Sequence, residues 1–235
     1  MTHTAADALH GIYTPATATS PARGALRALA LTGAINAVTV VAGIIAMSFI
    51  PDQMNLAAPD KALTQIAAHH RAEVVAGWMF ACCLAAFIPF IWLLVRSLNE
   101  ATRLPATIGA CIITAGATID VAASLIFVTV GHALTPNMTD PAARTVGMAM
   151  LNFGASIDSL YNLLLGVGLV LIARSMRASV WPRWLGMVAV AAGVLSIPVS
   201  LQWYAPAVAV VQFASGTLLL VWVVGLSAIA FKRSR

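Results

Sequence analysis

Two aspartates, Asp120 and Asp158, lie in the middle of long apolar runs, although only 9% of the residues in this chain are charged. Each ends a similar five-residue segment, GATID at 116–120 and GASID at 154–158. An aspartate at the centre of a membrane-spanning helix costs about 2.5–3.5 kcal/mol on insertion scales, so packing or partners must offset it. A close pair of such acids can carry protons, bind a cation or orient a basic ligand.

The neighbours of each aspartate predict a helix face of small and polar side chains. Positions three and four residues apart share a face. For both acids these positions hold a glycine and an alanine on one side; on the other they include Ser124 after Asp120, and Tyr161 and Asn162 after Asp158. Small residues let membrane helices approach closely. We therefore expect the two helices to pack through these faces, with both acids turned into the bundle interior.

The depth of the two acids follows from counting residues. Asp120 precedes Gly131, and Asp158 follows Val146, at what we take to be the outer ends of their runs. At about 1.5 Å per residue, both carboxyls are expected about 16–18 Å below the outer boundary, near the membrane midplane. Two neighbouring carboxylates in a low dielectric cannot both stay ionised cheaply, so one is expected to hold a proton at neutral pH.

A purely structural role is the alternative for these acids. Each could be neutral, or could be hydrogen-bonded to a nearby polar side chain and serve only to hold helices together. The candidate partners, which would also belong to a ligand or proton site, are Tyr161, Asn162, Ser124 and Asn152.

Histidines near the outer ends of the runs raise the question of a metal site. His69, His70 and Glu73 fall within one helical turn before the second run, and His132 follows the third. Zinc and iron accept such ligands. There is no HExxH motif and no repeated ExxH, so these residues are weak candidates and a hydrated interfacial cluster is the favoured interpretation. We predict no cofactor.

Enzyme motifs give no further direction. The chain has no GxSxG nucleophile motif and no Gly-rich phosphate-binding loop, and Gly166 and Gly168 lie in an apolar run as helix-packing positions. The three cysteines all fall in apolar runs without metal-ligand spacing. The sequence leaves enzyme activity uncertain and favours a protein that is not an enzyme.

Composition indicates what surrounds these residues. Of 235 residues 60% are hydrophobic, and the mean hydropathy is +0.91, whereas a soluble domain is about half apolar and about a quarter charged. Lipid must therefore be the main solvent of this chain. The net charge of +5 does not indicate nucleic-acid binding, because the basic residues are spread between apolar runs rather than clustered on one face.

Six apolar runs predict an all-α polytopic membrane protein, a bundle of six transmembrane helices. The runs cover about residues 29–50, 73–95, 105–131, 146–173, 185–201 and 206–231. We expect residues 23–235 to form one domain and residues 1–22, rich in Ala, Thr and Pro, to form a disordered tail. The fifth run is short and contains Pro198.

The basic residues predict the orientation. With a cytoplasmic amino terminus, that side carries ten Lys and Arg and the opposite side three, Lys61, Arg71 and Arg144. This bias predicts that both termini are cytoplasmic in a cell membrane, most simply a bacterial cytoplasmic membrane. Trp181 and Trp184 would mark the inner interface, and Trp203 and Tyr204 the outer one.

The outer loops contain helix-start signals. Thr139-Asp140-Pro141 places a capping side chain before a proline at the first helical position, so the fourth helix is expected to begin there. Asp60 could cap a helix that continues through His69 into the second span. These extensions could form a small lid.

The second half of the chain carries a family resemblance. Asp158 is followed by LLLGVGLVLIARS, a short basic loop and WPRWLGMVAVAAGVL. This arrangement resembles bacterial six-helix membrane proteins of the domain of unknown function 4386 type, over roughly residues 25–230. The resemblance implies the fold and the membrane location but no activity. It also implies that Asp120, Asp158, Pro182, Arg183 and Trp184 are characteristic positions; Pro182 and Arg183 additionally suit a stiff turn and a positive-inside anchor.

Three classes of function stay open at this point. The first is a small-molecule or proton-linked transporter that uses the two acids. The second is a membrane enzyme or redox subunit with a site at the outer His and Glu residues. The third is a structural or regulatory partner of another membrane protein or of a second copy of this chain.

Overall fold

The computed structural model describes residues 22–50, 59–134, 139–203 and 205–235, and these residues are all-α. The helices are α1 (Arg23–Met47), α2 (Pro59–Ala68), α3 (His70–Arg96), α4 (Arg103–Leu134), α5 (Pro141–Met176), α6 (Arg183–Val199) and α7 (Ala209–Ser234), with short 3-10 turns η1 (Glu100–Thr102) and η3 (Pro206–Val208). The tail predicted to be disordered lies outside the described residues, except for residue 22.

Five helices are long and apolar enough to cross a membrane: α1, α3, α4 with η1, α5 and α7. The chain is therefore a multi-pass membrane protein. The predicted fifth run corresponds to α6, which is apolar but has only 17 residues and ends one residue after Pro198. The count of six spans stays a prediction.

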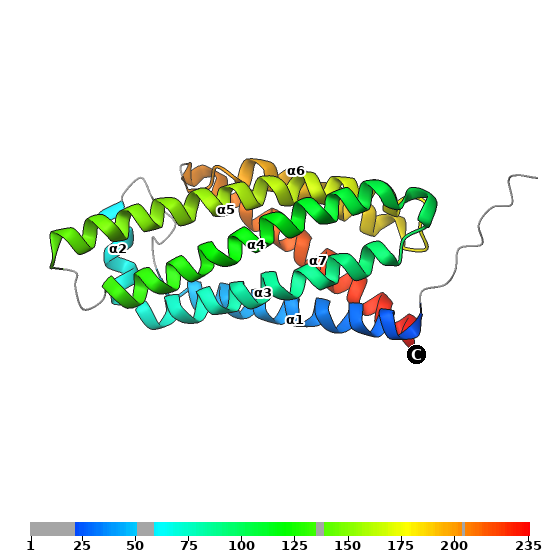
Figure 1. The fold of residues 1–235 in the computed structure, drawn as a ribbon, viewed down its shortest axis with the longest axis horizontal. Helices are drawn as coiled ribbons and strands as arrows, with labels where there is room; N and C mark the ends of the chain where they lie inside the picture. Colours follow the sequence, from blue (N-terminus) through cyan, green and yellow to red (C-terminus); the bar gives the residue numbers. More distant parts are fainter. Residues whose placement is uncertain (1–21, 51–58, 135–138, 204) are drawn as a thin grey trace, which may run out of the picture.

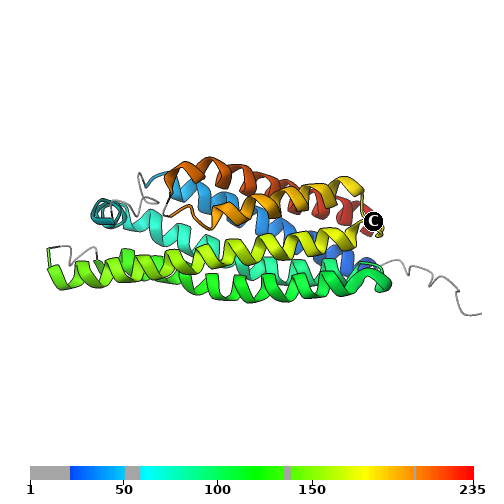
Figure 2. The ribbon, with the colours of Figure 1, turned by 90° about the horizontal axis from the view of Figure 1, so that it is seen from above.

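The five long helices and α6 form a closed ring. Each packs extensively on the next along the chain, in the order α1, α3, α4, α5, α6, α7, and α7 packs back on α1. They run up and down along one common direction (Figures 1 and 2). The core inside the ring includes Phe90 and Trp222, whose rings meet edge to face at 5.9 Å between centroids.

Glycines bring α5 into direct backbone contact with both of its neighbours. A Cβ on Gly109 of α4 would lie 2.6 Å from the Gly168 carbonyl oxygen, and one on Gly168 would lie 2.8 Å from the Gly109 oxygen. Gly166 and Gly193 of α6 face each other in the same way, at 2.6 and 2.8 Å. This confirms Gly166 and Gly168 as helix-packing positions, and it fixes the register of α4, α5 and α6.

The up-and-down arrangement sorts the basic residues to two ends. Helix α1 begins and α7 ends at one end, which we call the terminal end; α2 lies at the other, the α2 end (Figure 1). The three basic residues Lys61, Arg71 and Arg144 lie at the α2 end. The ten at the terminal end are Arg23, Arg27, Arg96, Arg103, Arg174, Arg177, Arg183, Lys232, Arg233 and Arg235.

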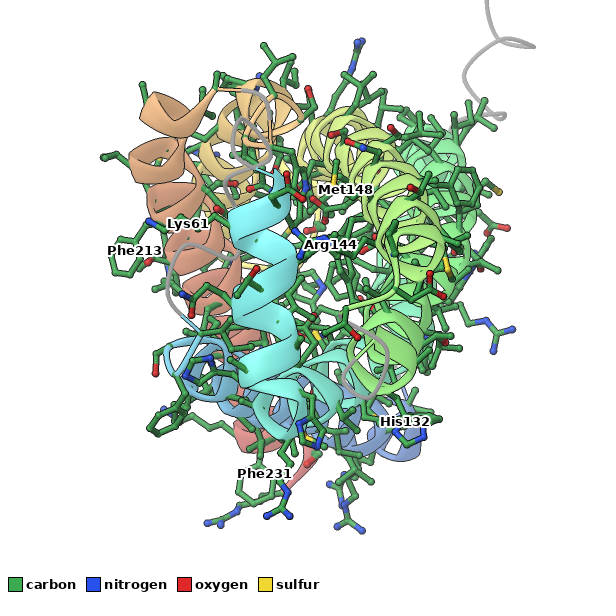
Figure 3. All side chains as sticks on the ribbon, turned by 90° about the vertical axis from the view of Figure 1, so that its left-hand side faces the viewer. Lys61, His132, Arg144, Met148, Phe213 and Phe231 are labelled. Carbon is green, nitrogen blue, oxygen red and sulfur yellow. The ribbon has the colours of Figure 1, made fainter. Side chains whose placement is uncertain are left out.

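Helix α2 lies crosswise over the α2 end of the bundle (Figure 3). Its buried Leu63 and Ile66 pack with Val130 and Leu151, from α4 and α5. An ion pair of 2.7 Å joins Asp60 to Arg144, which points toward α2 in Figure 3. This small cap agrees with the expected lid.

One sequence expectation here is wrong and one is confirmed. The helix that begins near Asp60 does not continue into the second span, because the chain turns at His69 (φ −116°, ψ 29°) and α3 starts as a separate helix at His70. Asp140 does cap α5, as expected: its Oδ1 accepts a hydrogen bond of 2.9 Å from the Ala142 amide, with Pro141 at the first helical position.

Candidate functional site

Asp120 lies on the face of α4 that packs against α5. Its side chain is buried, with 7% of its surface exposed. One turn earlier, a Cβ on Gly116 would lie 3.2 Å from ring carbon Cδ2 of Tyr161 and from Cβ of Leu164, both on α5. The small residues before Asp120 on α4 therefore make room for larger side chains of α5. They do not pack against the small residues before Asp158, contrary to the expectation from the sequence.

Asp158 is held by the turn between α6 and α7. Its Oδ2 accepts two hydrogen bonds of 2.6 Å, one from Nε2 of Gln202 and one from Nε1 of Trp203. Both donors are uncharged. Trp203 also stacks on Phe127 of α4, with 5.5 Å between ring centroids and 15° between planes. The carboxylate thus links α5 to a segment 44–45 residues away in sequence.

The short length of α6 is what brings these donors to Asp158. The helix ends at Val199, and turn hydrogen bonds from the Leu201 and Gln202 amides to the Pro198 and Val199 carbonyls continue the chain for a few residues. Because Gly193 holds α6 tightly against Gly166, the turn arrives beside the middle of α5 instead of beside its end.

The two acids lie close enough for their charges to interact, and Tyr161 lies within reach of both. The polar layer extends further across the ring. The buried Asn36 of α1 donates from Nδ2 to the carbonyl oxygen of Cys83 in α3, at 2.9 Å, and to its Sγ, at 3.0 Å. Cys83 in turn lies within electrostatic reach of Asp120.

The other predicted partners of the acids are placed differently. Asn162 donates to the main-chain oxygen of Asp158 at 2.9 Å and lies beside its carboxylate. Asn152 is exposed and donates to the Met148 carbonyl at 3.0 Å. Ser124 is buried on α4, at a point where its carbonyl oxygen would be 2.9 Å from a Cβ on Gly77 of α3. Of the four predicted partners, Tyr161 lies within reach of both acids and Asn162 lies at Asp158.

The histidines at the α2 end do not gather into one site with Glu73. His69 ends the α2 turn, with Nδ1 at 3.1 Å from the Gln65 carbonyl oxygen, and His70 begins α3. Glu73 is buried, with 2% exposed, whereas His132 is exposed on α4 (Figure 3). In the part of the chain that the structure describes, no three His, Cys, Asp or Glu side chains form a group that could hold a metal ion.

Pro182, Arg183 and Trp184 lie at the terminal end, away from the acids. Pro182 is the N-cap of α6 (φ −57°, ψ 137°) and Arg183 its first residue. Trp184 is 42% exposed, which suits an interface residue. Trp181 and Trp203, with 3% and 5% exposed, are buried rather than lipid-facing, and their level relative to the membrane interfaces stays a prediction. Tyr204 lies outside the described residues.

Sequence reasoning missed three members of the polar layer, Asn36, Gln202 and Trp203. A signal for Asn36 was present, since it is an amide inside the first apolar run. Gln202 and Trp203 follow the fifth run directly and read as the start of an outer loop. Only the fold reveals that this loop begins beside Asp158.

Comparison with known proteins gives a family but no activity. No curated protein and no solved structure matches this chain. A family model described as domain of unknown function (DUF4386) matches residues 31–229, which confirms the resemblance seen in the sequence. The chain therefore belongs to the DUF4386 family of proteins, whose function is unknown.

Proposed function

We propose that this protein is a proton-linked, transporter-like protein with six spans, and that Asp120 and Asp158 form its proton site. One observation carries the proposal. A buried acid on α4 lies near a second acid on α5, and the second is held by two uncharged donors from the α6–α7 turn. Such a pair can change its charge, and one partner is hydrogen-bonded to the turn that joins α6 to α7.

The distribution of basic residues supports an orientation with both termini cytoplasmic. Ten Lys and Arg at the terminal end against three at the α2 end is the bias that the positive-inside rule associates with the cytoplasmic side. Helix α6, with 17 residues, rises about 26 Å. Together with its flanking turns it comes close to crossing a hydrocarbon layer of about 30 Å.

The two acids share one level in the proposed membrane. Asp120 is 17 residues from Arg103 and Asp158 is 18 residues from Met176, so both lie about 26 Å from the terminal end. This level is inside the apolar layer, beyond its middle and toward the α2 end. A count from Gly131 and Val146 puts them nearer the midplane, because α4 and α5 are longer than the layer; the depth stays a prediction.

The hydrogen bonds suggest which acid carries the charge. Two N–H donors on one carboxylate stabilise its anion. A second negative charge close by in a low dielectric is costly. We therefore propose that Asp158 is the ionised acid of the pair and that Asp120 is the protonated one.

Uptake of a second proton, by Asp158, would change the hydrogen bonds that Gln202 and Trp203 make to its carboxylate. A protonated carboxyl donates as well as accepts. The Oε1 of Gln202 is buried and has no hydrogen-bond partner among the described residues. If the Gln202 amide turns over, this oxygen can accept the new proton, while the bond from Trp203 weakens. The α6–α7 turn is then held by the Gln202 bond with its direction reversed and by a weaker Trp203 bond, and these two arrangements are the two states that a coupled protein requires.

A structural role is the second candidate, and the same two hydrogen bonds favour it. In that case Asp158 stays ionised and ties α5 permanently to the α6–α7 turn. The acids would then contribute to folding and never change their protonation.

Infrared spectroscopy of the purified protein in lipid separates the two roles without a known substrate. We expect the wild type to have the C=O band of a protonated carboxyl at neutral pH, and Asp120→Asn to remove part of it. Asp158→Asn should alter the pH range in which the band disappears, because the coupling between the acids is lost. Asp140→Asn, at the exposed cap of α5, is the matched control.

Glu73 is also buried and would contribute a band that none of these variants removes. A titration that is identical in the wild type, Asp120→Asn and Asp158→Asn, with reduced amounts of both variants in the membrane, would support the structural role and contradict the proton site.

A further inference from the structure

A groove runs along the outside of the bundle where α7 closes the ring against α1. Its volume is about 860 Å³, in the range of about 300–1,000 Å³ typical of ligand sites. Its floor is formed by the buried Ala30, Gly33 and Ser227, and its rims by the exposed Leu31, Val224 and Phe231. Figure 3 shows Phe231 at the periphery of the bundle.

The charged side chains of the groove lie at the terminal end. Arg27 on α1 and Arg235 after α7 line it there, and no acidic residue lines it anywhere. Neither arginine has an ion pair with a carboxylate side chain within the described residues. The Arg235 guanidinium lies 4.6 Å from the centroid of the Phe231 ring, which keeps it over the groove.

The length of the groove matches one leaflet. From Arg27 to Val38 on α1, and from Val224 to Arg235 on α7, the lining spans 12 residues, or about 17 Å from the first to the last. Half of a hydrocarbon layer of about 30 Å is about 15 Å. The groove therefore runs from the headgroup level at the terminal end to about the middle of the layer.

We infer that this groove binds one anionic phospholipid from the leaflet at the terminal end. Its phosphate lies at Arg27 and Arg235, and one acyl chain lies along the floor between α1 and α7. Guanidinium groups suit phosphate oxygens because they present several N–H donors in one plane. A helix of a second copy fits less well, because it would cover two arginines that make no ion pair with a carboxylate side chain among the described residues.

Native mass spectrometry of the full-length protein tests the headgroup. The probes are dioleoyl phosphatidylglycerol and dioleoyl phosphatidylcholine, which have the same acyl chains and differ in charge. We expect the wild type to retain one phosphatidylglycerol with about a tenfold preference over phosphatidylcholine. The double variant Arg27→Gln/Arg235→Gln should lose that preference. Arg96→Gln/Arg177→Gln removes two exposed charges at the same end outside the groove and should keep it.

A second pair of variants tests the acyl-chain part. Ala34 is exposed and lines the groove, so Ala34→Phe should reduce retention of both lipids. Ala85 is exposed on α3 and does not line the groove, so Ala85→Phe should have no effect. These exposed positions should leave the fold intact, which thermal unfolding of each variant checks.

Three results would overturn the inference. The first is equal retention of the two lipids by the wild type. The second is an undiminished phosphatidylglycerol preference in Arg27→Gln/Arg235→Gln. The third is a lipid-free dimer that Ala34→Phe dissociates, because the groove would then be filled by a second copy of the chain.

Discussion

At the scale of single residues, Asp158 differs from Asp120 in its partners. Asp120 is buried and Asp158 half-buried, and among the described residues only Asp158 has two hydrogen bonds of 2.6 Å to its carboxylate from uncharged side chains. A carboxylate in a low dielectric depends on such donors, because each unsatisfied charge there is expensive. The donors Gln202 and Trp203 therefore matter as much as the acid.

Trp203→Phe removes the indole donor but retains an aromatic ring to stack on Phe127. Because a hydrogen bond to a charged group contributes about 1.5–3 kcal/mol, we expect a loss of stability of that size. Trp184→Phe, the same change at a residue that is 42% exposed, should change stability by less than about 0.5 kcal/mol. Denaturant unfolding in detergent micelles measures both. Equal losses in the two variants would mean that the bond to Asp158 contributes nothing.

Gln202→Leu tests the proposed turning over of the Gln202 side-chain amide, in which Oε1 replaces Nε2 as the partner of Asp158. Without the amide, Asp158 has neither the Nε2 donor nor the Oε1 acceptor, so we expect the infrared titration of the carboxyl band to shift toward that of Asp158→Asn. Gln212→Leu on α7, whose amide does not contact the acids, is the control and should titrate like the wild type. A wild-type titration in Gln202→Leu would exclude the amide from the proton site.

At the scale of elements, the helices follow from local sequence, but the contacts of the α6–α7 turn do not. Each predicted apolar run corresponds to a helix, five of them long and the other the 17-residue α6, because a long apolar segment has few other structures available in lipid. The capped start of α5 was also predictable, since Asp140 and Pro141 act within their own turn. The break at His69 was not, because it depends on Leu63 and Ile66 packing over α4 and α5.

Replacing a glycine by alanine should have opposite effects on stability at a packed position of α6 and at an open position of α7. Gly193→Ala places a Cβ 2.8 Å from the Gly166 carbonyl oxygen, so we expect a loss of about 1–3 kcal/mol as α6 is pushed away from α5. Gly216→Ala on α7 meets nothing within 4 Å and should gain about 0.4–1 kcal/mol, because alanine restricts the unfolded chain. Thermal unfolding compares the two; losses of similar size would contradict the close packing of α5 and α6.

At the scale of the whole molecule, sequence could predict the membrane bundle and the pairing of the two acids, but not the shape of the site. Asp120 and Asp158 lie on consecutive helices, so their proximity follows from the usual packing of neighbours. The hydrogen bonds to Asp158 from Gln202 and Trp203 depend on where α6, 25–41 residues further along the chain, begins and ends, and that in turn depends on the Gly166–Gly193 contact. Such long-range register is not encoded in any local pattern.

Cysteine labelling of intact cells tests the proposed orientation. In a background with Cys82, Cys83 and Cys111 replaced by alanine, Lys61→Cys at the α2 end should react with a membrane-impermeant maleimide added outside. Arg177→Cys at the terminal end should react only after the cells are permeabilised. The reverse pattern would invert the topology, and labelling of both from outside would contradict six spans.

If α6 spans the membrane as proposed, the unequal lengths of α5 and α6 would make the proposed proton site sensitive to the thickness of the membrane around it. Helix α5 has 36 residues and α6 only 17, so the apolar surface is about 26 Å high beside α6 and continues much further beside α5. A thicker bilayer must thin locally against α6 or pull its outer end away from Asp158, at a cost of fractions of a kcal/mol per Å. Lipid chain length would therefore act directly on the hydrogen bonds of Gln202 and Trp203, which links hydrophobic mismatch to the charge state of the acid pair.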